Sequence, residues 1–333
     1  MKFGAISDLH FALYGQDQIH PESNYPERLH YINKVVRQVA DEILSYGLDH
    51  IVVAGDTNHT KSIIHSLAMS VLLDYIRDYR NITFTIIDGN HDMSSKSGAG
   101  VSALKSLDQE SNVNMIHQTT EIENILFVPW DNKIVETVKK GTSEYLVSHF
   151  GLNEAQLSSG ISVISEIALK DLKQYKACLL GHYHKPQQIG NVYYIGSPIE
   201  LDWGEKGEEK RYLIVDTDSG SIESIPTTGY IKHIELDIDS ENKEEIIKQA
   251  KTLKEEGHQV KLNRTESIEL SEISSEFRIV DKVEKDVTNR GIDSSMTDLE
   301  KMEKFLDIKD IPDTKREKYL NMGKEILNSV RGI

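Results

Sequence analysis

Residues that can bind metal ions recur in this sequence, each group directly after a short apolar run. Carboxylate, amide and imidazole donors without thiolate suit borderline or hard divalent ions such as Mn²⁺ better than a structural zinc ion. On an extended chain alternate side chains share a face, so the members of a DxH or HxH pair point the same way. The residues are Asp8 and His10 in SDLH, Asp56 and His59 in GDTNH, Asn90, His91 and Asp92 in GNHD, His149 in VSHF, and His182 and His184 in LLGHYHKP.

Such a donor set predicts hydrolysis at phosphorus. Two divalent ions about 3.5–4 Å apart clamp a phosphodiester and lower the pKa of a bound water, so that hydroxide is available near neutral pH. Asp56 follows the middle one of the first three runs and is our candidate for a carboxylate that bridges both ions. Each motif alone also has a structural interpretation, because His182 and His184 could be surface residues, and His149 could belong to the core. Their joint occurrence favours the metal site.

The scaffold that brings these residues together is predicted from hydrophobic periodicity. Short apolar runs read as buried strands, and between the first three of them apolar residues recur at helical spacing, from Leu29 to Ile43 and from Ile63 to Ile76. This βαβαβ order favours a sheet covered by helices, in which sites form at the carboxyl ends of the strands. The predicted strands are 2–7, 50–56, 82–90, 125–130, 145–150, 177–182, 192–198 and 211–216.

After about residue 225 the pattern of apolar and charged residues changes. Strand-like runs at 231–238, 258–263 and 277–283 enclose a charged helical stretch at 241–256, which predicts a small α+β domain.

Two amphipathic helices are predicted in the tail. Thr297 with Glu300, and Thr314 with Glu317, each fit a capping box. The apolar stripes need a surface to cover them, either in the chain's own domain or in the groove of a partner. They are Leu299, Met302 and Leu306 in one helix, and Tyr319, Met322, Ile326 and Val330 in the other, with Pro312 between them.

The composition limits the class of protein. With 38% hydrophobic and 28% charged residues, and with no apolar run near the roughly 18 residues of a membrane span, we expect no membrane association. The N-terminal segment does not read as a signal peptide, so we expect a cytoplasmic protein. The single cysteine, Cys178, excludes an intrachain disulfide and should be a buried, inert thiol.

The net charge of −16 argues against wrapping nucleic acid over a broad basic surface. If DNA is the substrate, bound metals or a partner must supply much of the positive charge.

The order DxH, GDxxH, GNHD, a lone His and GHxH resembles the calcineurin-like metallophosphoesterase superfamily. Within it, GDTNH, GNHD and the segment YIGSPIELDWGEKGEEKRYLIVD at 194–216 are similar to the SbcD-type DNA repair and recombination nucleases, and the compact length is similar to their phage members. The chain departs from that family at Phe11 and Ala12, where Leu-Gly is usual; no ligand is affected, and only the local loop shape is in doubt.

The resemblance implies the fold and its parts. We expect an α/β two-sheet sandwich flanked by helices as the nuclease domain at 1–225. A small α+β capping domain that binds DNA would follow at 226–288, and a helical tail at 289–333 would bind an ATPase partner.

The resemblance also implies a role for each candidate. One ion would be held by Asp8, His10 and His184, the other by Asn90, His149 and His182, with Asp56 bridging. The ions would be two Mn²⁺, with Mg²⁺ as the other candidate. His91 would stabilise the pentacovalent phosphate or protonate the leaving oxygen, and His59 would be an accessory group, unless it only caps a helix or lies at the surface. Asp92 would orient His91 or cap the turn.

The implied function is that of a Mn²⁺-dependent DNA exonuclease, with endonuclease action on hairpins or ends. It would act as a homodimer with an SMC-like ABC ATPase of the SbcC type in double-strand-break processing, recombination and repair. Two alternatives remain at this stage. One is another metallophosphoesterase, acting on a nucleotide, a cyclic nucleotide or a phosphoprotein, and the other is a non-catalytic scaffold of the same fold.

Overall fold

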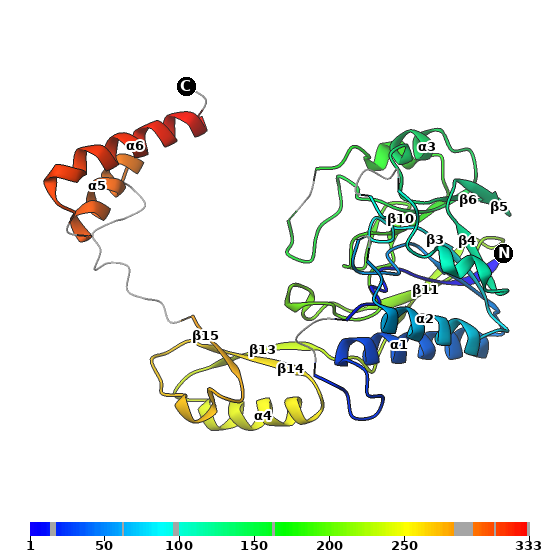
Figure 1. The fold of residues 1–333 in the computed structure, drawn as a ribbon, viewed down its shortest axis with the longest axis horizontal. Helices are drawn as coiled ribbons and strands as arrows, with labels where there is room; N and C mark the ends of the chain where they lie inside the picture. The colour runs from blue at the N-terminus through cyan, green and yellow to red at the C-terminus, as the bar shows by residue number, and fades with distance from the viewer. Residues whose placement is uncertain are drawn as a thin grey trace. The chain divides into compact units, whose positions relative to one another are not determined.

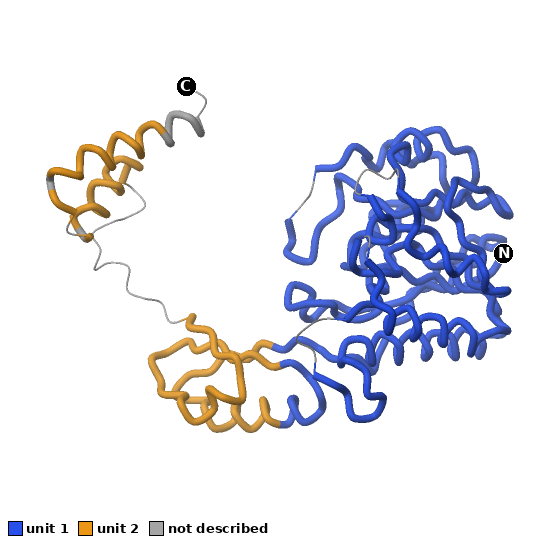
Figure 2. Tube along the Cα trace, viewed as in Figure 1, with its two compact units in different colours: residues 1–234, 252–259 blue, residues 235–251, 260–333 orange. Residues whose placement is uncertain are grey.

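The computed structural model describes residues 1–13, 18–61, 63–95, 100–161, 164–282, 296–309 and 311–331. The chain forms two compact units (Figure 2). One consists of Met1–Ile234 with Thr252–Gln259, and the other of Glu235–Lys251 with Val260–Ile333.

The first unit contains two six-stranded sheets. In the first sheet, with the order β12-β11-β1-β2-β3-β4, the strands β1 to β4 run parallel, and β11 pairs antiparallel with β1. In the second, with the order β5-β6-β7-β8-β10-β9, the strands β6, β7, β8 and β10 run parallel. The strands of the first sheet are β1 Lys2–Ile6, β2 His50–Val53, β3 Thr83–Ile87, β4 Val113–Ile116, β11 Arg211–Asp216 and β12 Ser221–Pro226. Those of the second are β5 Thr120–Ile122, β6 Ile125–Val128, β7 Tyr145–His149, β8 Ala177–Gly181, β9 Gln187–Ile189 and β10 Val192–Tyr194.

Helices cover the outer faces of both sheets. The helices α1 Glu27–Ser45 and α2 Ser66–Asp78 lie side by side (Figure 1) and share a core with the first sheet. The short helix α3 Ile134–Lys140 packs on the second sheet. This unit also contains three short 3₁₀ helices, η1 Lys105–Gln109, η2 Leu169–Leu172 and η3 Trp203–Glu205.

The strands alternate between two cores, as their period of two requires. In β2, Ile51 and Val53 face α1 and α2, whereas Val52 joins the core between the sheets. In β8, Cys178 faces outward to the core shared with α3, and Leu179 faces the other sheet. The expected two-sheet sandwich flanked by helices is therefore confirmed. Cys178 is buried as predicted, and burial raises the pKa of its thiol.

All eight strands predicted in this unit are present. Strand β11 has the predicted bounds, and the other seven strands are shorter than the predicted runs, because the last residues of each run lie beyond the strand. Four strands were not predicted, namely β4, β5, β9 and β12, since these edge segments are short or polar. The second helix was predicted too long: Ile63 precedes α2 and is 63% exposed. Among the described residues no helix is long and apolar enough to cross a membrane.

The elements that follow form a three-stranded sheet and two helices in the tail. The sheet has the order β13-β14-β15, with α4 between its first two strands in sequence. The bounds are β13 His233–Ile238, α4 Lys243–Glu255, β14 Gln259–Arg264, η4 Ser271–Ile273, β15 Arg278–Asp281, α5 Asp298–Ile308 and α6 Asp313–Arg331. These runs agree with the strands and helices predicted after residue 225.

One of the two predicted capping boxes is present. The side chain of Thr297 accepts a hydrogen bond from the backbone N–H of Glu300 at the start of α5, and the carboxylate of Glu300 accepts the backbone N–H of Thr297. The second prediction is wrong, because α6 begins at Asp313 and Thr314 lies inside the helix. The carbonyl of Pro312 accepts the first helical N–H groups instead, those of Lys315 and Arg316.

Candidate metal centre

The carboxyl ends of five strands meet at one edge of the sandwich and bring all seven predicted metal ligands together. The ends of β1, β2 and β3 come from the first sheet, and those of β7 and β8 from the second. Backbone hydrogen bonds join neighbouring ends, from Asp8 N to the Gly55 carbonyl at 3.1 Å and from His10 N to the Asp56 carbonyl at 3.0 Å. The two sheets are linked by His182 N, which donates to both carboxylate oxygens of Asp8, at 3.1 and 3.2 Å.

Asp8, His10 and His184 form one donor group. The Nε2 atoms of His10 and His184 lie 3.0 Å apart, and Nε2 of His184 lies 4.0 Å from Oδ1 of Asp8. One donor atom from each of the three residues lies within 4.8 Å of the others. Burial lowers the pKa of His10 well below its usual range, so its ring is neutral and can act as a ligand.

Asn90, His149 and His182 form a second donor group. The Oδ1 atom of Asn90 lies 3.1 Å from Nε2 of His149 and 3.0 Å from Nδ1 of His182. The Nδ1 of His149 donates to the carbonyl of Ala54 at 2.8 Å, which turns Nε2 towards the site. Burial lowers the pKa of His182 to about 3, so this ring is neutral as well.

Asp56 lies between the two groups. Its Oδ2 is 3.8 Å from Nε2 of His10 and 3.2 Å from Nε2 of His149, while its Oδ1 accepts the backbone N–H of His91 at 2.8 Å. Burial alone would raise the pKa of Asp56, but the imidazole of His149 outweighs it and holds that pKa well below its usual range. This position suits a carboxylate that bridges two ions.

The backbone is strained at four of these residues. The φ angles are 54° at Asp8, 49° at His10, 51° at Asp56 and 97° at His182, all in the left-handed region that side-chain-bearing residues rarely adopt. Each such residue costs on the order of 1–3 kcal/mol, and such strain clusters at functional sites. The loop that contains Asn90 also needs a glycine, because a Cβ at Gly89 would collide with the backbone nitrogen and carboxylate of Asp56.

The buried charges at this edge fit the binding of cations. Asp8 and Asp56 are 0% and 2% exposed, and burial raises the pKa of Asp8. In the described part of the chain, the ion-pair partners of these two carboxylates are histidines, with no lysine or arginine among them. Burial lowers the pKa of His149, but its contacts with Asp56 more than compensate and raise it to about 9. A divalent ion can replace that proton and neutralise the carboxylates.

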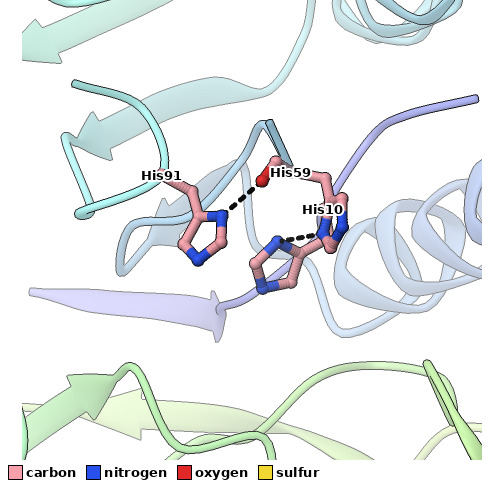
Figure 3. A group of neighbouring side chains, drawn as sticks. All are labelled: His10, His59 and His91. Atoms are coloured by element: carbon pink, nitrogen blue, oxygen red, sulfur yellow. Dashed lines mark hydrogen bonds between the residues drawn. The ribbon is translucent and has the colours of Figure 1, made fainter. Parts of the chain in front are cut away.

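His59 and His91 lie beside the first donor group (Figure 3). The Nδ1 of His59 is 3.3 Å from Nδ1 of His10. His59 therefore contacts this predicted ligand at the ring nitrogen that does not face His184. Burial lowers the pKa of His59 to about 4, with further contributions from His91 and Arg28. His91 contacts the carbonyl of His59 through Nδ1, and its ring lies 5.0 Å from that of His10.

Asp92 joins two loops. Its carboxylate accepts backbone N–H groups of Asn58 and Gly89, both at 2.8 Å, and of Thr57 at 3.3 Å. These bonds correspond to the turn-capping alternative for Asp92. Its pKa is raised to about 8 by burial, with Asp56 and Asp88 adding to the effect.

The sequence reasoning missed two buried residues behind His184. Glu205 Oε1 lies 2.7 Å from Nδ1 of His184, and Oε2 accepts a hydrogen bond from Nζ of Lys210 at 2.7 Å. Lys210 is 0% exposed and also donates to Glu208, Ser197 and the His184 carbonyl. Both Glu205 and Lys210 belong to the segment 194–216, for which the family resemblance concerns the Gly-Ser-Pro stretch and implies no role for either residue.

A cleft of about 270 Å³ opens onto this site. It is lined by Leu157, Ser158, Ser159, His182, Tyr183, His184, Asp202, Gly204 and Glu205. Two of the predicted ligands, His182 and His184, are therefore accessible to a molecule that enters it.

Comparison with known proteins gives a family and a distant relative. A family model described as calcineurin-like phosphoesterase matches residues 1–186. Exonuclease subunit 1 of Enterobacteria phage T4 is 25% identical over an alignment of 203 residues, and the match covers 57% of this chain and 60% of that protein. The chain thus spans about 60% of the length of this relative.

Three solved structures are similar at low sequence identity. An archaeal phosphodiesterase is 14% identical, with a TM-score of 0.33, over 68% of this chain and 99% of its own. A dimetal phosphatase from Danio rerio is 10% identical, with a TM-score of 0.41, over 68% and 99%. The nuclease MPE of Pseudomonas putida is 12% identical, with a TM-score of 0.30, over 66% and 86%.

Proposed function

Because the chain belongs to the calcineurin-like phosphoesterase family, we propose that it is a two-metal-ion nuclease that hydrolyses phosphodiester bonds in DNA. The observation that carries the reaction type is the convergence of seven donor side chains from five strand ends at one edge of the sandwich, where two of them, His182 and His184, line a cleft. DNA as the substrate is supported by the similarity to exonuclease subunit 1 of phage T4, which covers 57% of the chain.

In this proposal Asp8, His10 and His184 hold one ion, and Asn90, His149 and His182 hold the other, with Asp56 bridging. The oxygen and imidazole donors favour Mn²⁺, with Mg²⁺ as the other candidate. When bound, the two ions supply Lewis acidity and an activated water to a phosphodiester. The strained loops of the chain hold the donors in place before any ion binds, which reduces the reorganisation that binding requires.

His91 is the proposed proton donor to the leaving oxygen. Its backbone is held by Asp56 and its Nδ1 by the carbonyl of His59, so Nε2 is the atom that can deliver a proton. Asp92 acts on this step only indirectly, because it fixes the loop that carries His91 by accepting the N–H of Gly89. His59 is proposed to orient His10 through the contact of their Nδ1 atoms.

We also propose a function for each of the three parts of the chain. Residues 1–225 would carry catalysis, 226–288 would cap the site and contact DNA, and 289–333 would bind an SMC-like ATPase of the SbcC type. Exposed apolar side chains in the tail support the last role, namely Leu299 at 38%, Phe305 at 51%, Tyr319 at 41% and Met322 at 48%. The side chains of Ile326 and Val330 lie outside the described residues. A partner would also supply the positive charge that a chain with net charge −16 lacks.

Homodimer formation, a cytoplasmic location and a role in double-strand-break repair stay predictions. The homodimer and the role in repair rest on the resemblance to the SbcD-type nucleases. The cytoplasmic location, which is the host cytoplasm if the chain is encoded by a phage, rests on the sequence expectations given above.

The test is an assay of the purified chain on three substrates in parallel. End-labelled duplex DNA, a cyclic nucleotide and a phosphopeptide are incubated with Mn²⁺, with Mg²⁺ or with chelator. We expect Mn²⁺-dependent release of nucleotides from DNA, with little turnover of the other two substrates. Turnover of the cyclic nucleotide or phosphopeptide without DNA degradation would assign the site to another phosphoesterase reaction. If the protein binds no Mn²⁺ at all, the result would favour the alternative of a non-catalytic scaffold.

A further inference from the structure

A second cluster of metal-binding side chains lies outside the candidate metal centre. His20 and Glu22 precede α1, and His30 lies in its first turns. One donor atom from each of these residues lies within 4.8 Å of the others. None of the three is among the seven ligands proposed above, so the cluster needs an explanation of its own.

The ring of His30 carries an unused nitrogen. His30 is 9% exposed, and its Nε2 is buried and has no hydrogen-bond partner among the residues that the structure describes. Its Nδ1 lies 2.9 Å from Oγ of Ser23, which also accepts the backbone N–H of Tyr25 at 3.2 Å. With Nδ1 donating to Ser23, the lone pair of His30 is on Nε2. Buried polar atoms are rarely left unpaired, so this atom points to a missing ligand.

Glu22 stands opposite this lone pair. Its Oε2 lies 3.9 Å from Nε2 of His30, which is too long for a hydrogen bond. The same separation fits an ion between the two atoms, because zinc binds imidazole and carboxylate at roughly 2.0–2.2 Å. Burial lowers the pKa of His30, so no proton competes for its lone pair near neutral pH.

We propose that His20, Glu22 and His30 bind a third divalent ion, of the borderline class of Zn²⁺. Two imidazoles and one carboxylate are a donor set that zinc accepts, with water completing the coordination. In metal sites, a hydrogen bond from the ring nitrogen that does not bind the ion fixes the tautomer of the histidine, and the contact of Nδ1 of His30 with Ser23 has this position.

Binding requires one ring to turn. The His20 and His30 rings are stacked, with centroids 3.6 Å apart and an angle of 6° between planes. Lone pairs in parallel rings do not converge on one ion. His20 is the ring that turns, because it is only half-buried and its Nδ1 holds one long bond, 3.3 Å from the backbone nitrogen of Glu22. The side chain of Glu22 is 75% exposed and can follow the ion.

The ion would tie the segment before α1 to the helix itself. Its effect would be on the stability of the fold at this point, because it would join residues that precede α1 to a residue within the helix.

The test counts metal sites on the full-length, chelator-treated chain by calorimetric titration with Zn²⁺. We expect three sites per wild-type chain and two in Glu22→Gln and in His20→Asn. These two positions are chosen because neither side chain belongs to the buried core, and circular dichroism verifies the fold. His65→Asn, which changes a histidine before α2 that belongs to neither cluster, is the matched control and keeps three sites.

The inference is overturned if Glu22→Gln and His20→Asn bind as many ions as the wild type. A second readout is the melting temperature: Zn²⁺ beyond two equivalents raises it in the wild type and in His65→Asn, and not in Glu22→Gln. Neither readout involves DNA, so the test of the third site does not depend on the proposed nuclease activity.

Discussion

The Nδ1 atom of His184 lies 2.7 Å from Oε1 of Glu205, and this contact connects the candidate metal centre to a buried ion pair. Oε2 of Glu205 accepts a hydrogen bond from Lys210, which is completely buried. Burial would raise the pKa of Glu205, but the contacts with His184 and Lys210 lower it to about 2. The carboxylate is therefore ionised, and it fixes the tautomer that leaves Nε2 of His184 for a metal ion.

Glu205→Gln should weaken metal binding without removing a ligand. The amide keeps the shape of the side chain but no longer polarises His184, and partners of this kind contribute about 10–100-fold to metal affinity. Mn²⁺ affinity is measured by electron paramagnetic resonance, with one of two sites expected to weaken. Glu208→Gln is the matched control. The carboxylate of Glu208 accepts a hydrogen bond from Lys210 at 2.8 Å, as that of Glu205 does, but it does not contact the ring of His184. Equal Mn²⁺ affinity in Glu205→Gln and Glu208→Gln would refute the role of Glu205.

His91→Asn should retain both ions and lose most DNA cleavage. We expect kcat to fall by about 10²–10⁴-fold, as for other general acids, because the proton to the leaving oxygen is lost. Mn²⁺ stoichiometry should not change, since His91 is not a proposed ligand. Cleavage at the wild-type rate would show that His91 has no part in the reaction. A DNA with a good leaving group at the scissile bond should be cleaved nearly normally by the variant, which distinguishes proton donation from a structural role.

His117 should make the stability of the fold depend on pH. Its Nδ1 lies 2.6 Å from Asp88 and its Nε2 lies 3.0 Å from Asp108. The hydrogen bond with Asp88 is the main cause that raises the pKa of His117 to about 9, against the effect of burial. Because this folded-state pKa exceeds the ordinary value of about 6.5, the stabilisation is complete below about pH 6.5 and is lost as the pH rises through 9.

The measurement for His117 is urea unfolding of the metal-free wild type and of His117→Gln. The wild type should exceed the variant in free energy of unfolding at about pH 6, and the difference should largely vanish at about pH 10. A difference of equal size at both pH values would contradict the assignment. The bond matters for the site because Asp88 precedes Gly89 and Asn90 at the end of β3.

Deleting residues 290–333 should abolish capture of an SMC-like ATPase and leave Mn²⁺-dependent cleavage of simple duplex ends. The milder variant Phe305→Glu with Tyr319→Glu should do the same, because both side chains are exposed, at 51% and 41%. Lys318→Glu alters a charge on the same helix and is the control. Co-purification of the ATPase with the double variant at wild-type yield would exclude this surface, and loss of folding on deletion would mean that the stripes cover the chain's own core.

The sequence alone predicted the scaffold and the composition of the site. A strand is a local apolar run with a period of two, so Asp8, Asp56 and Asn90 could each be placed after a strand without knowledge of its neighbours. The second predicted capping box failed for the same local reason: Thr314 with Glu317 has the right spacing, but Pro312 starts the helix earlier. Edge strands such as β4 were missed because they lack a continuous apolar run.

Only the tertiary structure decided which polar atoms meet. The contact of His184 with Glu205 spans 21 residues, and that of His59 with His10 spans 49, and neither spacing carries a pattern. The positive φ angles at Asp8 and His182 likewise arise where loops from different sheets are joined by hydrogen bonds. Hydrophobic periodicity is a property of neighbouring residues and can be read along the chain. The direction of a buried polar group depends on partners that only folding brings within reach.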